Sequence, residues 1–173
     1  MAEKPKYCVV RTDLMSGTQN VADLMSVRFY KGGSSQEAVE NGVIAKVIGL
    51  EDGEREVYKV QEAADSDKLS ECVLIASPEL MKDERKVNLT EFINEKGSIA
   101  RAYLLRSRNI FSLTKEGFAT SKEPAKGDTV GIGENGKLDK DKDSFGKCIA
   151  IETAGAATYY VIEIGVVEAA AGE

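Results

Sequence analysis

The sequence contains no histidine at all, and only three cysteines among 173 residues. Histidine is the commonest general base and a frequent metal ligand in proteins. Its absence excludes every catalytic triad that depends on an imidazole, and it removes the usual activator of a serine or cysteine nucleophile.

The three cysteines also do not indicate a metal or redox site. Cys8, Cys72 and Cys148 lie far apart, without the C-x-x-C spacing of a zinc site or a redox motif. Each lies within a run of aliphatic residues, which predicts a buried, reduced thiol that packs as a small hydrophobic group. The alternative is a thiolate nucleophile that works without a histidine partner.

Long apolar runs and a positive net charge are missing as well. The apolar runs are the length of a strand, as in "CVLIA" at 72–76, and the N-terminus has no secretory signal. The formal net charge is −6, and the basic residues are interleaved with acids. An acidic chain gains little from counterion release, so neither a nucleic acid nor a membrane is expected as a partner.

Two motifs resemble ligand sites but lack the necessary surroundings. Gly131, Gly133 and Gly136 have the G-x-G-x-x-G spacing, yet no amphipathic helix follows, and Asn135-Gly136 is typical of a hairpin turn. Downstream, "DKDKDSFGKCIA" lacks the glycine and the final glutamate of a calcium loop. The sequence therefore predicts no catalytic residue, no cofactor and no metal.

What the sequence does contain is a series of short β-prone segments separated by Gly, Asn and Asp. Asp52-Gly53 predicts a hairpin, and short helices are expected after Ser77 and over 88–97. The predicted fold is mainly β, a sandwich or barrel-like arrangement of antiparallel hairpins with one or two short helices. We expect an N-terminal arm and loop over 1–42, a first β-rich half with short helices over 43–98, and a second β-rich half over 99–173, with a single domain as the alternative.

Several segments occur in an order that resembles a protein family. They are "GLEDGEREVYKV" (49–60), "LIASPELMKDERK" (74–86), "EFINEKGSIARAYLLR" (91–106), "NIFSLT" (109–114), "AKGDTVGI" (125–132), "FGKCIAIE" (145–152) and "TYYVIEIG" (158–165). Together they resemble the head-associated structural proteins of tailed phages and prophages of Gram-positive bacteria. The resemblance covers most of residues 43–165.

The resemblance implies a capsid decoration protein that stabilises the outside of the head shell and acts by binding alone. The implied partner is the major capsid protein, the implied location is the surface of the virion head after assembly in the host cytoplasm, and a homo-oligomer is expected, with a trimer favoured. The candidate docking residues are in the N-terminal segment: Leu14, Met15, Leu24 and Met25. The alternative is that this segment packs on its own domain.

Three other functions remain open. The nearest is a head–tail connector, neck or tail-tube subunit, which would form rings or tubes through sheet edges. An enzyme or ligand-binding module would need a pocket with converging polar groups. A single-strand nucleic-acid binder would need aromatic residues among Lys and Arg, yet Tyr159 and Tyr160 have no basic neighbours.

Overall fold

The regular structure of the chain is almost entirely β-strand. The computed structural model describes residues 5–15, 23–80 and 88–165. Its described helices are single turns of 3-10 helix: η1 (Thr12–Leu14), η3 (Leu69–Glu71), η4 (Leu89–Glu91), η5 (Lys115–Gly117) and η6 (Glu134–Gly136). The predicted mainly β, barrel-like fold with antiparallel hairpins is confirmed.

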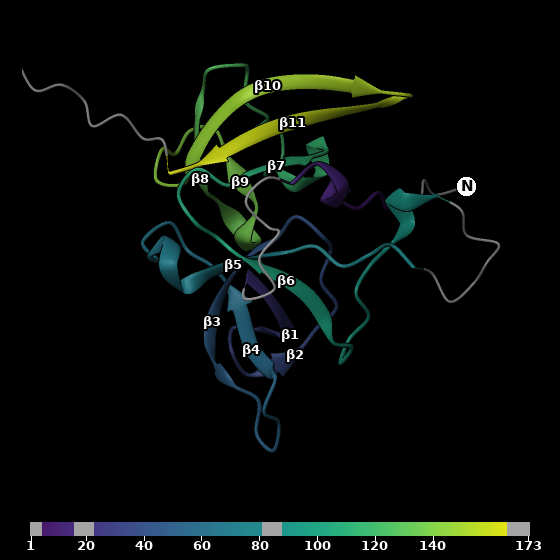
Figure 1. Cartoon of the computed structure of the whole chain (residues 1–173), viewed down its shortest axis with the longest axis vertical. Helices are drawn as coiled ribbons and strands as arrows, with labels where there is room; N and C mark the ends of the chain where they lie inside the picture. Colours follow the sequence, from purple (N-terminus) through teal and green to yellow (C-terminus); the bar gives the residue numbers. More distant parts are fainter. Residues whose placement is uncertain (1–4, 16–22, 81–87, 166–173) are drawn as a thin grey trace, which may run out of the picture.

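The first sheet closes into a small barrel (Figure 1). Its strands are β1 (Leu24–Lys31), β2 (Ser35–Gln36), β3 (Ile44–Leu50), β4 (Val57–Glu62), β5 (Cys72–Ile75) and β6 (Ala100–Leu104). The order is β2-β1-β4-β3-β5-β6, and β6 also pairs with β1, so five strands form a ring to which β2 is attached. β1 and β4 run parallel, with Val27 opposite Tyr58, whereas the other pairs are antiparallel.

The second sheet is antiparallel and stays open. It contains β7 (Ile110–Leu113), β8 (Thr129–Ile132), β9 (Leu138–Asp139), β10 (Gly146–Ala154) and β11 (Ala157–Ile164), in the order β7-β11-β10-β8-β9. The chain passes from the first sheet to the second between Leu104 and Ile110. This differs from the boundary expected at 98, because Ala100 and Ala102 point into the barrel core.

The expected arm over 1–42 contributes to both sheets instead. Val10 bridges to Leu113 at the outer side of β7, and Cys8, Val9 and Val10 are buried. Further along, β1 is a barrel strand with neighbours on both sides. These residues belong to the sheets because their aliphatic side chains complete the two cores.

Both predicted hairpin turns are present. Asp52 and Gly53 lie in the loop between the antiparallel strands β3 and β4, where Gly53 has a φ of +82°. Asn135 and Gly136 lie between β8 and β9, with φ values of +55° and +70°. Positive φ at both central residues is what a type I′ turn requires, which explains the Asn-Gly pair.

The predicted short helices are reduced to a single turn. Over 88–97 only Leu89–Glu91 is helical, and the side chain of Asn88 caps it by accepting a hydrogen bond from Thr90 N. Residues 77–80 have no helix, and residues 81–87 lie outside the described part of the chain. Leu89, Phe92 and Ile93 therefore do not form one helical face, because Leu89 lies in the turn and the chain is extended at Phe92.

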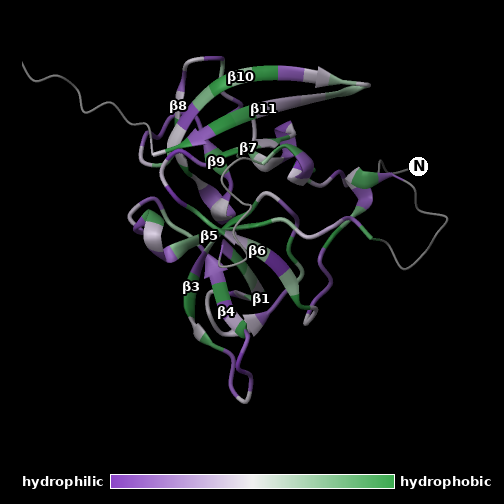
Figure 2. Ribbon diagram, in the orientation of Figure 1, coloured by the Kyte–Doolittle hydropathy of each residue, from purple (hydrophilic) through white to green (hydrophobic). Residues whose placement is uncertain are grey.

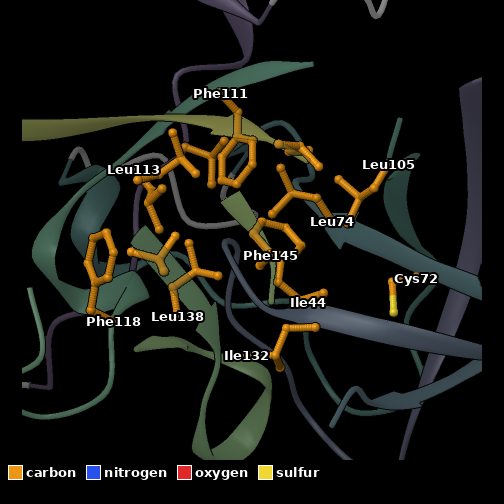
Figure 3. Packing of buried hydrophobic residues seen from close by; sticks show 14 of the residues in the cluster. Ile44, Cys72, Leu74, Leu105, Phe111, Leu113, Phe118, Ile132, Leu138 and Phe145 are labelled. Atoms are coloured by element: carbon orange, nitrogen blue, oxygen red, sulfur yellow. The ribbon is translucent and has the colours of Figure 1, made fainter. Parts of the chain in front are cut away.

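Two hydrophobic cores divide the interior. The smaller fills the barrel and is lined by Val27, Phe29, Val39, Val43, Ala45, Val60, Val73, Ile75, Ala100 and Ala102. The larger lies between the barrel and the second sheet, where Ile44 and Leu74 meet Phe111, Leu113, Phe118, Leu138 and Phe145 (Figure 3). Phe111 and Phe145 pack edge to face, with their ring centroids 6.2 Å apart.

β5 shows how the two cores are joined. Its side chains alternate between the faces of the strand, so Val73 and Ile75 enter the barrel core while Cys72 and Leu74 enter the larger core. All four residues are fully buried, because β5 is covered on both faces. The β8–β9 turn adds a close backbone contact, since a Cβ on Gly136 would lie 2.3 Å from the carbonyl oxygen of Ile44.

Candidate functional site

A groove lies on the outside of the barrel. It has a volume of about 520 Å³ and is open to solvent. Ser26 of β1 and Arg101 of β6 form one part of its lining, and the segments after β5 and before β6 form the rest. Residues distant in sequence meet here because β6 pairs with both β1 and β5.

A buried amide network holds the segments beneath the groove. Asn41, which is fully buried, donates from Nδ2 to the carbonyl oxygen of Ser77 at 2.9 Å and accepts from Ser77 N at 2.9 Å. Asn94 donates from Nδ2 to Val39 O and to Asn41 Oδ1. Ser77 Oγ accepts from the backbone N–H of Arg101 at 2.9 Å, which connects the network to β6. Because each of these bonds joins different segments, the base of the groove is tied to the barrel wall.

The walls of the groove carry exposed apolar side chains. Leu80 is 83% exposed and Ile99 is 54% exposed, and both line the groove together with Phe92 and Ile93. Ile99 points outward because its neighbour Ala100 points into the barrel core. Exposed apolar side chains that surround a groove mark a contact surface more often than isolated ones do.

Charged groups accompany these apolar walls. Glu91 and Glu95 lie on one segment of the lining, and the exposed Arg101 lies on β6. The groove thus offers apolar contact flanked by both signs of charge, an arrangement suited to a peptide or protein segment.

The predicted docking residues lie on two different elements. Leu14 ends η1, which contacts β7, and it is 50% exposed, whereas Met15 packs against the larger core. Leu24 and Met25 begin β1; Leu24 is 37% exposed and Met25 packs against the barrel core. Residues 16–22 between the two pairs lie outside the described part of the chain.

None of these four residues lines the groove, although Leu24 shares β1 with the lining residue Ser26. Leu24 lies two residues from Ser26 on β1, so both side chains point to the outer face of the barrel. Their partners on β6 are Tyr103 and Arg101, respectively. Docking through these four residues stays a prediction.

The prediction of buried thiols is confirmed. Cys8, Cys72 and Cys148 are free and buried, each at most 2% exposed. Burial raises the pKa of Cys8, and the nearby carboxylate of Glu40 adds to the effect. Burial also raises the pKa of Cys72 to about 11, and it raises that of Cys148. These thiols are protonated at neutral pH, so they are poor nucleophiles.

The described residues contain no group of three or more Cys, Asp or Glu side chains placed to hold a metal ion. The helices in the same part of the chain are too short and too polar to cross a bilayer.

Sequence reasoning missed most of the groove. Leu80 follows Pro78 in a segment where a short helix was expected, whereas Ile99 follows Gly97 at the start of an alternating, β-prone stretch. The alternation over 99–102 places Ile99 and Arg101 on the other face of the strand from the buried Ala100 and Ala102, but it gives no signal for Leu80. The buried amides Asn41 and Asn94 have no comparable signal, because the hydrogen bond between them joins residues that are 53 positions apart in the sequence.

Comparisons with protein-family models, with curated proteins and with solved structures gave no match to this chain.

Proposed function

We propose that this protein is a structural component of a phage virion, a decoration protein that docks on the outside of the head shell and stabilises it by binding alone. The order of sequence segments that resemble the head-associated family supports the proposal. The exposed apolar groove on a closed barrel is the structural observation that carries it.

The groove suits a docking role because its geometry is formed before any partner arrives. The network of Asn41, Ser77 and Asn94 ties the lining segments to β6, and the barrel behind them is closed. A rigid site loses little conformational entropy on binding. Leu80 and Ile99, which are half or more exposed in the free chain, would bury their side chains against the partner.

The proposed partner is the major capsid protein, which would supply an extended segment with apolar side chains. A segment that carries one acidic and one basic residue would match Arg101 and the carboxylates of Glu91 and Glu95. The location that follows is the surface of the virion head, after assembly in the host cytoplasm. The homo-oligomer expected from the sequence, with a trimer favoured, stays a prediction.

The deciding measurement is the copy number of the chain in purified particles, by quantitative mass spectrometry against the major capsid protein. A shell decoration role requires a ratio of about one, or about one-third for a trimer at each three-fold position. A handful of copies in each particle would move the protein to the neck, and its absence from particles would refute a virion role.

A pair of variants tests the groove itself. Leu80→Asp should weaken binding to purified heads by about tenfold or more, because it places a charge where the partner would bury an apolar contact. Ile48→Asp is the matched control, since Ile48 is 48% exposed on β3 and does not line the groove. Equal binding by both variants would place the docking surface elsewhere.

A neck or tail-tube subunit is the second candidate, and one observation favours it. The outer part of β10 has a strand neighbour on one side only within the described residues, and tube or ring subunits associate through such edges. Rings or tubes formed by the isolated chain in negative-stain images would favour this candidate over decoration.

A further inference from the structure

The β10–β11 hairpin extends beyond the rest of the second sheet (Figure 1). β10 pairs with β8 only at Gly146 and Lys147, and the last backbone contacts on that side join Cys148 to Gly127 and Asp128. On its other side, β10 stays paired with β11 as far as Ala154. Every residue over 151–156 is exposed. Within the described residues, β10 therefore has one free edge from Ile149 to Ala154.

Other segments bridge to the two outermost strands of the second sheet. The barrel closes through β1 and β6. At one end of the second sheet, Val10 bridges to Leu113 of β7. At the opposite end, Phe118 bridges to Leu138 of β9, and Ala119 N donates to Leu138 O at 2.8 Å. Within the described residues, the open stretch of β10 over 149–154 is longer than those of β3 over 47–50 and of β11 over 157–159.

This edge also has few of the features that prevent an exposed strand edge from pairing with another strand. Between Ile149 and Ala154 there is no Lys, Arg or Pro, and Glu152 is the single charged residue. The one bulge lies between Cys148 and Ala150, at the start of the free stretch. Figure 2 shows the contrast with the β3–β4 loop, which is strongly hydrophilic, whereas the end of the hairpin is close to neutral. In an antiparallel ladder, alternate residues direct both backbone N–H and C=O groups to the open side.

We infer that this edge of β10 pairs with the same edge of a second copy of the chain, antiparallel and across a two-fold axis near Ile151. In that register Ile151 lies opposite Ile151 of the second copy. Glu152 then lies opposite Ala150 of the second copy, so the Glu152 carboxylates of the two copies do not lie directly opposite each other. The two sheets would join into one continuous antiparallel sheet.

A second copy is the occupant that the observations favour. A two-fold axis lets one edge provide both sides of the contact, so no other open strand is needed. The chain carries a net charge of −6, which makes two copies repel over most of their surfaces. Contact is therefore favoured where charge is sparse, as it is between Ile149 and Ala154. This inference does not depend on a virion role.

Sedimentation equilibrium of the whole chain across a concentration series tests the pairing. The wild type should reach a dimer at high concentration. Ile151→Lys should weaken association by about tenfold or more, because it replaces an apolar cross-strand pair with two like charges directly opposite each other. Ile48→Lys is the control, since Ile48 has a similar exposure, 48% against 44% for Ile151, but lies on β3.

Hydrogen exchange by mass spectrometry gives a second readout that folding defects would not imitate. Amides over 149–154 should become more protected as the wild-type concentration rises, while those of β3 stay unchanged. In Ile151→Lys this concentration dependence should be lost, with the melting temperature close to that of the wild type. A wild type that remains monomeric, a trimer, or an Ile151→Lys variant that still dimerises would each overturn the inference.

Discussion

The two sheets deal with their open edges in different ways. The first sheet joins β6 to β1 and so closes into a barrel. The second sheet remains open, and it depends on coil residues such as Val10 and Phe118 to cover its ends. The barrel also provides one wall of the core on which the second sheet packs, through Ile44 and Leu74. The two sheets therefore differ in how their outer strands are covered, while they share the larger core.

The largest effect on this arrangement should come from Leu74→Ala. The side chain is fully buried between the two sheets, and a leucine-to-alanine change in a core costs about 2–5 kcal/mol. We expect a loss of about 3 kcal/mol in the free energy of unfolding, measured by urea denaturation. Hydrogen exchange should show that amides of β4 and of β7 lose protection together.

The neighbouring Val73→Ala variant serves as the control for Leu74→Ala. Val73 is equally buried, but it faces the barrel core. If Leu74→Ala released β7 and β11 while β4 kept its full protection, the two sheets would be separate folding units, and the shared core would not couple them.

A smaller but more specific effect is expected from Gly136→Ala. The residue has a φ of +70°, and a new Cβ would lie 2.3 Å from Ile44 O, so the hairpin would have to move away from the barrel. Gly53→Ala is a matched control, because its φ is +82° and a Cβ there would meet no atom within 4 Å. The control should lose about 1–2 kcal/mol from backbone strain alone.

Thermal and urea unfolding of the two glycine variants would separate strain from contact. Gly136→Ala should be less stable than Gly53→Ala by about 1–3 kcal/mol. Equal stabilities would show that the β8–β9 turn can shift on the barrel at no cost.

The smallest effect is expected from Asp65, which follows β4 and contacts the second sheet. Asp65 Oδ1 accepts hydrogen bonds from Ile132 N at 3.2 Å and from Ser144 Oγ, and Lys142 Nζ lies 3.4 Å from Oδ2. Burial acts to raise the pKa of Asp65, but the bond from Ser144 and the charge of Lys142 outweigh it, so the pKa is lowered. A lowered pKa means that ionised Asp65 stabilises the folded state.

That stabilisation should be complete above about pH 4, the ordinary pKa of aspartate, and should disappear as the pH falls through the lowered pKa. Because the site is partly exposed, we expect less than about 1 kcal/mol. Unfolding free energies of the wild type and of Asp65→Asn, measured from pH 7 down to pH 2, should differ at neutral pH and converge in acid. A constant difference across this range would assign the effect to the lost hydrogen bonds alone.

The local features of the fold were predictable from the sequence, and its long-range pairings were not. Asn135-Gly136 and Asp52-Gly53 identify hairpins because positive φ favours these residue types. The parallel pairing of β1 with β4 has no such local signal, since Val27 and Tyr58 meet only after the intervening strand β3 has been placed. For the same reason, residues 24–31 were expected in an arm although they form a barrel strand.

The candidate site follows the same division. Sequence patterns selected Leu14, Met15, Leu24 and Met25 because apolar residues stood among polar ones, yet Met15 and Met25 pack against the two cores. The groove was not predictable, because its lining comes from β1, β6 and the segments between β5 and β6. A deletion of residues 1–26 would also remove Cys8 and Val10 from the larger core, so it cannot test docking without disturbing the fold.

The three buried thiols give this chain built-in reporters of its own motions. Cys8 lies in the segment that covers β7, Cys72 lies on the barrel strand shared by both cores, and Cys148 lies where β10 leaves β8. A protonated and buried thiol reacts with an alkylating reagent only while its surroundings are open, so each labelling rate measures the opening of a different segment. The three labelling rates of the unmodified protein would therefore show which of these segments opens first. Cys148 is the thiol closest to the free edge of β10.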